Sequence, residues 1–171
     1  MQTQTVSHTL SIITVFLLSA IIATPSMGAS AQATVSVKVV RHISITNKAN
    51  MSFGHLSVGA AAGSVVLNED GSRNPTGGVI LESGGSSTPA SFIANGEPNQ
   101  SFAITLPESV TLVDNEGHTM TVEQFSNSTG KTGRFDDAGR HDLNVGATLR
   151  VNSHQALGDY RGAMDISVNY N

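Results

Sequence analysis

The feature of this sequence that most constrains its fold is an alternation of apolar and polar residues with a period of two. The alternation is clearest at the C-terminal end, where the even-numbered positions are Tyr160, Gly162, Met164, Ile166, Val168 and Tyr170. The odd-numbered positions between them are mostly polar. Because successive side chains of a β-strand point to opposite faces of the sheet, this pattern predicts a strand over residues 160–170 with one face in the core.

The same period recurs along the chain, in short runs separated by turns rich in Gly, Asn, Asp and Pro. No stretch shows a helical period, and the glycines of residues 58–64 indicate a loop there. We expect about nine or ten short strands, because runs of this length and spacing are typical of antiparallel sandwiches and barrels. The predicted fold is therefore all-β, an antiparallel sandwich or barrel formed by one domain over residues 32–171.

The composition excludes several classes of function. Charged residues make up 13% of the chain, about half the usual share of roughly 25%, and the net charge is −4. A nucleic-acid-binding protein normally carries a basic patch, so we expect no nucleic-acid partner. The chain has no cysteine, which excludes disulfides, thiolate metal sites, iron–sulfur clusters and thiol catalysis.

The sequence contains no recognisable pattern of catalytic or metal-ligating residues. It lacks the G-x-S-x-G of serine hydrolases. Gly130-Lys131-Thr132 lacks the first glycine of a phosphate-binding loop, because Phe125 occupies that position. The histidines show neither H-x-H nor H-x₃-H spacing. We therefore expect neither an enzyme nor a bound metal or cofactor.

The N-terminal region predicts export. Residues 10–23 form an apolar run that is shorter than the about 20 residues of a membrane span, and its length suits the centre of a secretory signal. Ala29-Ser30-Ala31 follows it as a small-x-small cleavage site. We expect a signal peptide over residues 1–31, cleaved between Ala31 and Gln32.

A second alternating run comes directly after the predicted cleavage site. Its apolar members are Ala33, Val35, Val37 and Val39. Ile43 and Ile45 continue the same parity, but Arg41 interrupts it. Because an arginine in the core is costly, Arg41 marks a boundary between two functional pieces of this part of the chain.

Both ends of the chain resemble a known group of proteins. Gly158 is fourteenth from the C-terminus and Tyr170 is penultimate, which resembles the C-terminal signature of chaperone–usher fimbrial subunits, or pilins. The N-terminal alternation followed by Ser52-Phe53-Gly54 resembles spore-coat-U-like domains. The sequence is most similar to a bacterial family of secreted β-rich domains of unknown function, which shares the Ser-Phe-Gly element, a turn like Gly77-Gly78 and the Gly-x-Tyr…Val-x-Tyr end.

The resemblance implies an antiparallel immunoglobulin-like β-sandwich that lacks its last strand and is completed by a neighbour. It implies that residues 32–39 are a donor strand, with Ala33, Val35, Val37 and Val39 facing inward. The C-terminal strand would form one wall of the acceptor groove and bind a periplasmic chaperone, through Gly158, Tyr160, Met164, Ile166, Val168 and Tyr170. The expected function is that of an exported structural or adhesive subunit of a fimbria-like surface polymer, assembled by donor-strand exchange. Its partners would be neighbouring subunits, the chaperone and an outer-membrane usher.

The same residues allow a second interpretation. Residues 32–39 could complete the sandwich of their own domain, because insertion in cis and in trans requires the same alternation. The product would be a monomeric periplasmic or surface binding module, with glycans as one candidate ligand. The chain has no Trp and only two Tyr, so few side chains are suited to stacking on a sugar.

Overall fold

The computed structural model describes residues 28–171. Most of the predicted signal peptide, residues 1–27, lies outside the described residues. The chain divides into two units, with a boundary between Val37 and Lys38. Residues 28–43 have no regular secondary structure, and residues 28–42 are exposed. All the strands lie in the second unit.

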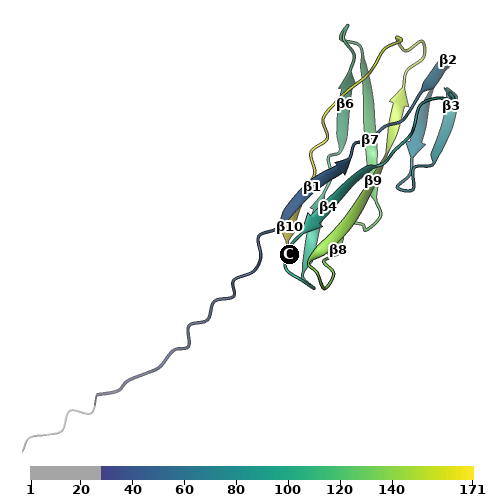
Figure 1. Cartoon of the computed structure of the whole chain (residues 1–171). Coiled ribbons are helices and arrows are strands. Elements are labelled where there is room, and N and C mark those ends of the chain that lie inside the picture. Colours follow the sequence, from purple (N-terminus) through teal and green to yellow (C-terminus); the bar gives the residue numbers. More distant parts are fainter. Residues whose placement is uncertain (1–27) are drawn as a thin grey trace, which may run out of the picture. The chain divides into compact units, whose positions relative to one another are not determined.

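The second unit is built from ten strands, all paired antiparallel, and residues 28–171 contain no helix (Figure 1). None of the described residues therefore forms a helix long and apolar enough to cross a membrane. The strands are β1 (Ser44–Ala49), β2 (Leu56–Leu67), β3 (Arg73–Leu81), β4 (Ala90–Asn95), β5 (Ser101–Thr105), β6 (Ser109–Val113), β7 (Thr119–Asn127), β8 (Thr132–Arg134), β9 (Arg140–Val151) and β10 (Ser167–Tyr170).

Strand β9 is the centre of a seven-stranded sheet. Val145 is paired with Ala90 of β4 and with Asn127 of β7, so β4 and β7 lie on opposite edges of β9. Arg150 is likewise paired with β2 on one edge and β7 on the other. Strands β4 and β2 therefore share one edge of β9, and β1, β3 and β6 extend the sheet outward from β4, β2 and β7.

A smaller sheet covers part of this one and makes the fold a β-sandwich. Its strand order is β10-β5-β8. Between the two sheets lies a core that contains Phe102 of β5, Val168 of β10, Leu143 of β9 and Phe92 of β4. Phe102 also stacks on Phe135, with ring centroids 4.3 Å apart. The N-terminal half of β9 is therefore buried between two sheets, as the alternating pattern predicted.

The C-terminal half of β9 belongs to a second core cluster with a different cover. This cluster joins Leu149 and Val151 of β9 to Met120 and Val122 of β7 and to Val65 of β2. No strand of the smaller sheet contributes a buried residue to it. The second core cluster is covered instead by half-buried side chains that lie outside the smaller sheet. These are Met51, Phe53, Leu56, Val58, Leu81, Val110, Leu112, Phe125 and Tyr160.

The prediction of a loop over residues 58–64 was wrong, because β2 continues through them. The register with β3 shifts between Val58 and Gly63, so the extra residues form a bulge inside the strand. At this crossing a Cβ on Gly78 would collide with the carbonyl oxygen of Ala61. The glycines therefore allow close backbone approach within the β2–β3 pair, and Gly77-Gly78 lies within β3 rather than in a turn.

The C-terminal strand is shorter than predicted. Only residues 167–170 form β10, whereas residues 162–166 have no regular secondary structure. The predicted alternation of burial is nevertheless present: Met164, Ile166, Val168 and Tyr170 are buried or half-buried, and the odd-numbered residues between them are exposed. The facing of the side chains was predicted correctly, but the length of the paired strand was not.

Candidate functional site

A groove of about 790 Å³ opens over the second core cluster. Its floor is the inner face of the seven-stranded sheet, where Val110, Met120, Val122 and Leu149 contribute side chains from β6, β7 and β9. One rim is formed by residues 50–56 and the other by residues 155–164. The floor of the groove is thus apolar, whereas the rims also supply polar atoms, and a hollow of this kind on a sheet is a candidate binding surface.

The first rim is held by Arg73 of β3. Its guanidinium Nη1 donates to the carbonyl oxygen of Phe53 at 2.7 Å and to that of His55 at 3.3 Å. Ser52 is bridged to Thr88 by two backbone hydrogen bonds. Gly54 between them has a φ of 69° and leaves no space for a Cβ beside Arg73. These contacts position the Phe53 side chain at the groove.

The second rim has unpaired backbone. Arg161 exchanges two backbone hydrogen bonds with Val113 at the end of β6, at 2.9 and 3.0 Å. Within the described part of the chain, no backbone hydrogen bond joins residues 162–166 to another segment. β10 continues this segment as an edge strand of the smaller sheet, paired with β5 alone among the described strands. An unpaired edge beside an apolar groove is suited to accept an additional strand.

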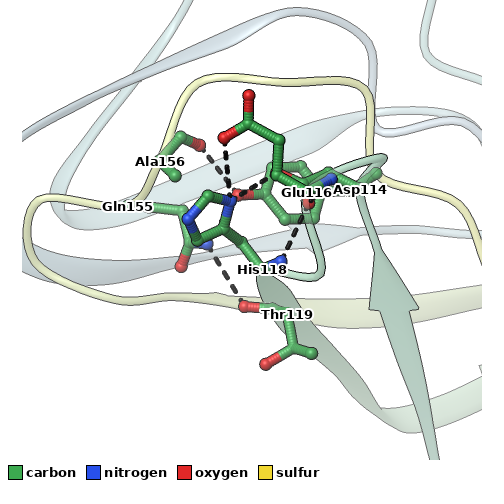
Figure 2. A network of polar contacts seen from close by, with 7 residues as sticks. Asp114, Glu116, His118, Thr119, Gln155 and Ala156 are labelled. Carbon is green, nitrogen blue, oxygen red and sulfur yellow. Dashed lines mark hydrogen bonds and ion pairs between the residues drawn. The ribbon is translucent and has the colours of Figure 1, made fainter.

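A polar network fixes the start of the second rim (Figure 2). The Asp114 carboxylate accepts hydrogen bonds from the backbone N–H groups of Glu116 and His118, and it contacts His118 Nδ1 at 2.8 Å. Burial raises the pKa of the Asp114 carboxyl, but the hydrogen bonds from the His118 side chain and from the two backbone N–H groups outweigh it and lower the pKa below its ordinary value. The ionised carboxylate therefore orders the β6–β7 turn.

Tyr160 and Gln155 connect that turn to the rim. The Tyr160 hydroxyl donates to the carbonyl oxygen of Ala156 at 2.8 Å and accepts from Gln155 Nε2 at 2.9 Å. Gln155 Nε2 also lies 3.2 Å from the carbonyl oxygen of Thr119 at the start of β7. The loop before the C-terminal segment is thereby fixed to the seven-stranded sheet, and the Tyr160 ring packs against the second core cluster.

The predicted C-terminal site residues divide between two places. Gly158, Tyr160 and Met164 line the groove. Ile166, Val168 and Tyr170 lie further along, against the first core cluster between the two sheets. The structure thus brings only the first part of the predicted set to the groove.

The predicted donor residues are exposed. The exposed fractions of Val35, Val37 and Val39 are 95%, 87% and 87%. Ala33 is exposed as well, and so are Ala31 and Gln32 at the predicted cleavage site. We refer to residues 32–39 as the extension. Three exposed valines in alternation are unusual for a chain that places its other alternating runs in a core.

Sequence reasoning missed the residues that build the rims. Arg73 is an isolated cation in a polar stretch, and nothing in its neighbourhood indicates that it binds the carbonyl of Phe53. Asp114 lies four residues before His118, in what reads as an ordinary turn. Leu157, at the rim and 96% exposed, had no pattern that could identify it. The contacts of Arg73 are long-range, which a local pattern does not contain, and the local contacts of Asp114 do not reveal that its turn lies beside a groove.

A second, more polar hollow of about 470 Å³ lies near the loop before β9. His141 is fixed there by Thr129 at Nε2 and by the carbonyl oxygen of Arg134 at Nδ1, at 2.8 and 2.9 Å. Asp136 accepts backbone N–H groups of its own turn. Over residues 28–171, no group of three or more acidic or histidine side chains is arranged to hold a metal ion. The polar side chains of His141 and Asp136 in this hollow are therefore engaged in hydrogen bonds that hold the neighbouring turn and strand.

Comparisons with known proteins place the domain in a family. The sequence model described as "Domain of unknown function (DUF4402)" matches residues 43–170. No match is found among curated proteins or among solved structures. The family match confirms the predicted resemblance at the level of a domain of unknown function. It begins after the extension and includes both rims of the groove.

Proposed function

This chain belongs to the DUF4402 family, and we propose that it is a structural subunit of a fimbria-like polymer assembled by donor-strand exchange. In this proposal the groove of one subunit accepts the extension of the next. The observation that carries it is the apolar groove beside the unpaired backbone of residues 162–166, in a chain whose extension exposes alternating valines.

The chemistry of the two parts is complementary. An inserted extension would place Val35, Val37 and Val39 on the apolar floor and offer its backbone to the C-terminal segment. Burial of each valine stabilises the complex by about 1.5–3 kcal/mol before the cost of ordering the extension. Backbone pairing with residues 162–166 would fix the register and slow dissociation.

Charge favours a second copy of this chain as the donor. The extension carries Lys38, and Arg41 follows the extension by two residues. No acidic residue precedes Glu69. Residues 43–171 then contain seven of the nine Lys and Arg residues and all 13 Asp and Glu residues. A basic extension and an acidic domain attract each other in a head-to-tail arrangement, and this attraction weakens with added salt.

The same function implies export and helper proteins. The predicted signal would deliver the subunit to the periplasm of a Gram-negative cell. There a chaperone would cover the groove, and an outer-membrane usher would carry the subunit to the surface. An empty groove leaves apolar side chains such as Phe53 and Val110 only half-buried, so a subunit without a donor would need such cover to avoid aggregation.

The alternative, a self-complete binding module, is less well supported. Both tyrosines direct their hydroxyls to neighbouring backbone and side-chain groups, so neither ring is held free for a sugar. A glycan array probed with the exported protein would favour this alternative if it gave a signal that a surface substitution abolished.

Two complementary variants test the proposal. Val37→Asp disables the extension as a donor but leaves the groove intact. Val110→Lys places a charge in the groove but leaves the extension intact. Each variant alone is expected to remain monomeric in size-exclusion chromatography with light scattering. Their mixture is expected to give a 1:1 dimer, because only one of the four donor–acceptor combinations retains both an intact extension and an intact groove.

Matched controls lie beside each position. Ser36→Asp changes a residue that would face outward from the groove, and Thr111→Lys changes an exposed neighbour of Val110 on β6. Both should polymerise like the unchanged protein. A mixture of Val37→Asp and Val110→Lys that stays monomeric, together with an unchanged protein that ignores added peptide of residues 32–40, contradicts donor-strand exchange.

A further inference from the structure

The chain immediately after the extension is held to the domain at one residue, Arg41. Its backbone N–H donates to Glu97 Oε2 at 3.0 Å, and its carbonyl oxygen accepts from the Tyr170 hydroxyl at 2.8 Å. Its guanidinium Nη1 reaches the carbonyl oxygen of Ala138 at 3.4 Å. The chain leaves the domain at this point, yet both backbone groups of Arg41 are engaged by residues far away in the sequence.

Tyr170 is the centre of this arrangement. Its hydroxyl also accepts the backbone N–H of Glu97 at 2.7 Å, so one oxygen joins the β4–β5 connection to Arg41. Its ring packs edge-on against Phe135, with centroids 6.2 Å apart. A Cβ on Gly96 would lie 2.8 Å from the hydroxyl oxygen, so the glycine provides the space that the hydroxyl occupies.

We propose that Tyr170, Glu97 and Ala138 form a clamp that holds the chain at Arg41, immediately after the extension. Only Val40 separates the clamped residue from Val39, the last of the alternating valines. The clamp therefore leaves a single residue between the held point and the extension. Short, held connections of this kind restrict the angles that two joined bodies explore.

The clamp also connects the two ends of the proposed assembly, and this step rests on the proposed function. Tyr170 lies on β10, which continues the segment that borders the groove. An extension bound to residues 162–166 would pull on that segment, and Tyr170 would pass the pull directly to Arg41 and to the outgoing extension. Tension along the polymer would then reach the outgoing extension through the C-terminal strand, and β5 and Glu97, which bind that strand, would share the load.

Limited proteolysis with trypsin tests the clamp without requiring a polymer. Of the nine Lys and Arg residues of the protein, Lys38 lies in the exposed extension and Arg41 is the clamped residue, so cleavage after these two can be compared. Cleavage after Arg41 is expected to be about tenfold slower than after Lys38, because its backbone must first be released from two hydrogen bonds. In Tyr170→Phe, which removes one of these two bonds, the difference between the two rates, followed by mass spectrometry, is expected to shrink.

The second tyrosine supplies the matched control. Tyr160→Phe also removes a hydroxyl that makes two hydrogen bonds, but these bind Ala156 and Gln155 at the groove. It should leave the slow cleavage after Arg41 unchanged. Equal cleavage after Lys38 and Arg41 in the unchanged protein, or equal acceleration in both tyrosine variants, overturns the clamp.

Filaments test the mechanical part separately. Filaments of Tyr170→Phe are expected to bend more than those of the unchanged protein, measured as a shorter persistence length in electron micrographs. Equal persistence lengths overturn the load path but not the clamp. If the unchanged protein forms no filaments, the proposed function fails, and the proteolysis still decides whether the clamp exists.

Discussion

Gly158 packs directly against the carboxylate of Asp114. A Cβ at residue 158 would lie 3.1 Å from Asp114 Oδ2 and 3.3 Å from its Cβ, closer than ordinary van der Waals contact. The Asp114 side chain is only 4% exposed, so it has little freedom to move aside. The glycine at the fourteenth position from the end is thus explained by the close approach of the rim to the β6–β7 turn.

Gly158→Ala should therefore loosen the second rim. The added methyl must displace Asp114 from its hydrogen bonds, and overpacking of this kind costs about 1–3 kcal/mol. We expect a lower free energy of unfolding in urea and weaker binding of a peptide of residues 32–40. The control is Gly59→Ala, because a Cβ there meets only one atom, at 3.6 Å. Equal stability of the two variants would show that Asp114 yields without cost.

The lowered pKa of Asp114 makes stability depend on pH. A carboxyl whose pKa is lower in the folded state stabilises the fold fully above its unfolded pKa of about 3.9, and this stabilisation is lost as the pH falls through the folded value. The melting temperature should accordingly fall between pH 5 and the acid range, and less steeply in Asp114→Asn. Asp165→Asn, at an exposed position, should keep the slope of the unchanged protein.

Substitution of Arg73 should change the position of the first rim, and with it peptide binding, more than the packing of the core. Arg73→Met keeps an unbranched apolar side chain but cannot donate to the carbonyl oxygen of Phe53, which frees residues 53–55. Loss of a charged hydrogen bond costs about 1.5–3 kcal/mol, so peptide affinity is expected to fall about tenfold or more in fluorescence polarisation. Arg150→Met removes an exposed ion pair with Glu123 and should leave the affinity unchanged.

The sequence pattern identified the sandwich because burial in a sheet follows the period of the strand. It predicted the inward facing of Met164, Ile166 and Val168 for this reason. It failed at residues 58–64, where the glycine-rich run is a bulge inside β2 and not a loop. Glycine indicates only that the backbone is unusually close or unusually turned, and partner strands decide which.

The position of the groove could not be predicted from the alternation of residues. Alternation shows that a residue faces inward, but not which layer covers it. Leu143 and Leu149 are on the same strand with the same parity, yet one lies between two sheets and the other under the groove. The difference arises because β10 and β5 cover only part of the larger sheet, and this is a consequence of topology.

That difference yields a last prediction. Leu143 and Leu149 are 0% and 3% exposed, so truncation to alanine should destabilise the domain in both cases, by about 2–5 kcal/mol. Only Leu149 lines the groove, and we expect only Leu149→Ala to weaken binding of the peptide of residues 32–40. Isothermal titration calorimetry at a temperature where both variants are folded measures this. Equal loss of affinity in both variants would place the binding site outside the groove, whereas a selective loss in Leu149→Ala locates the bound strand over the open half of β9.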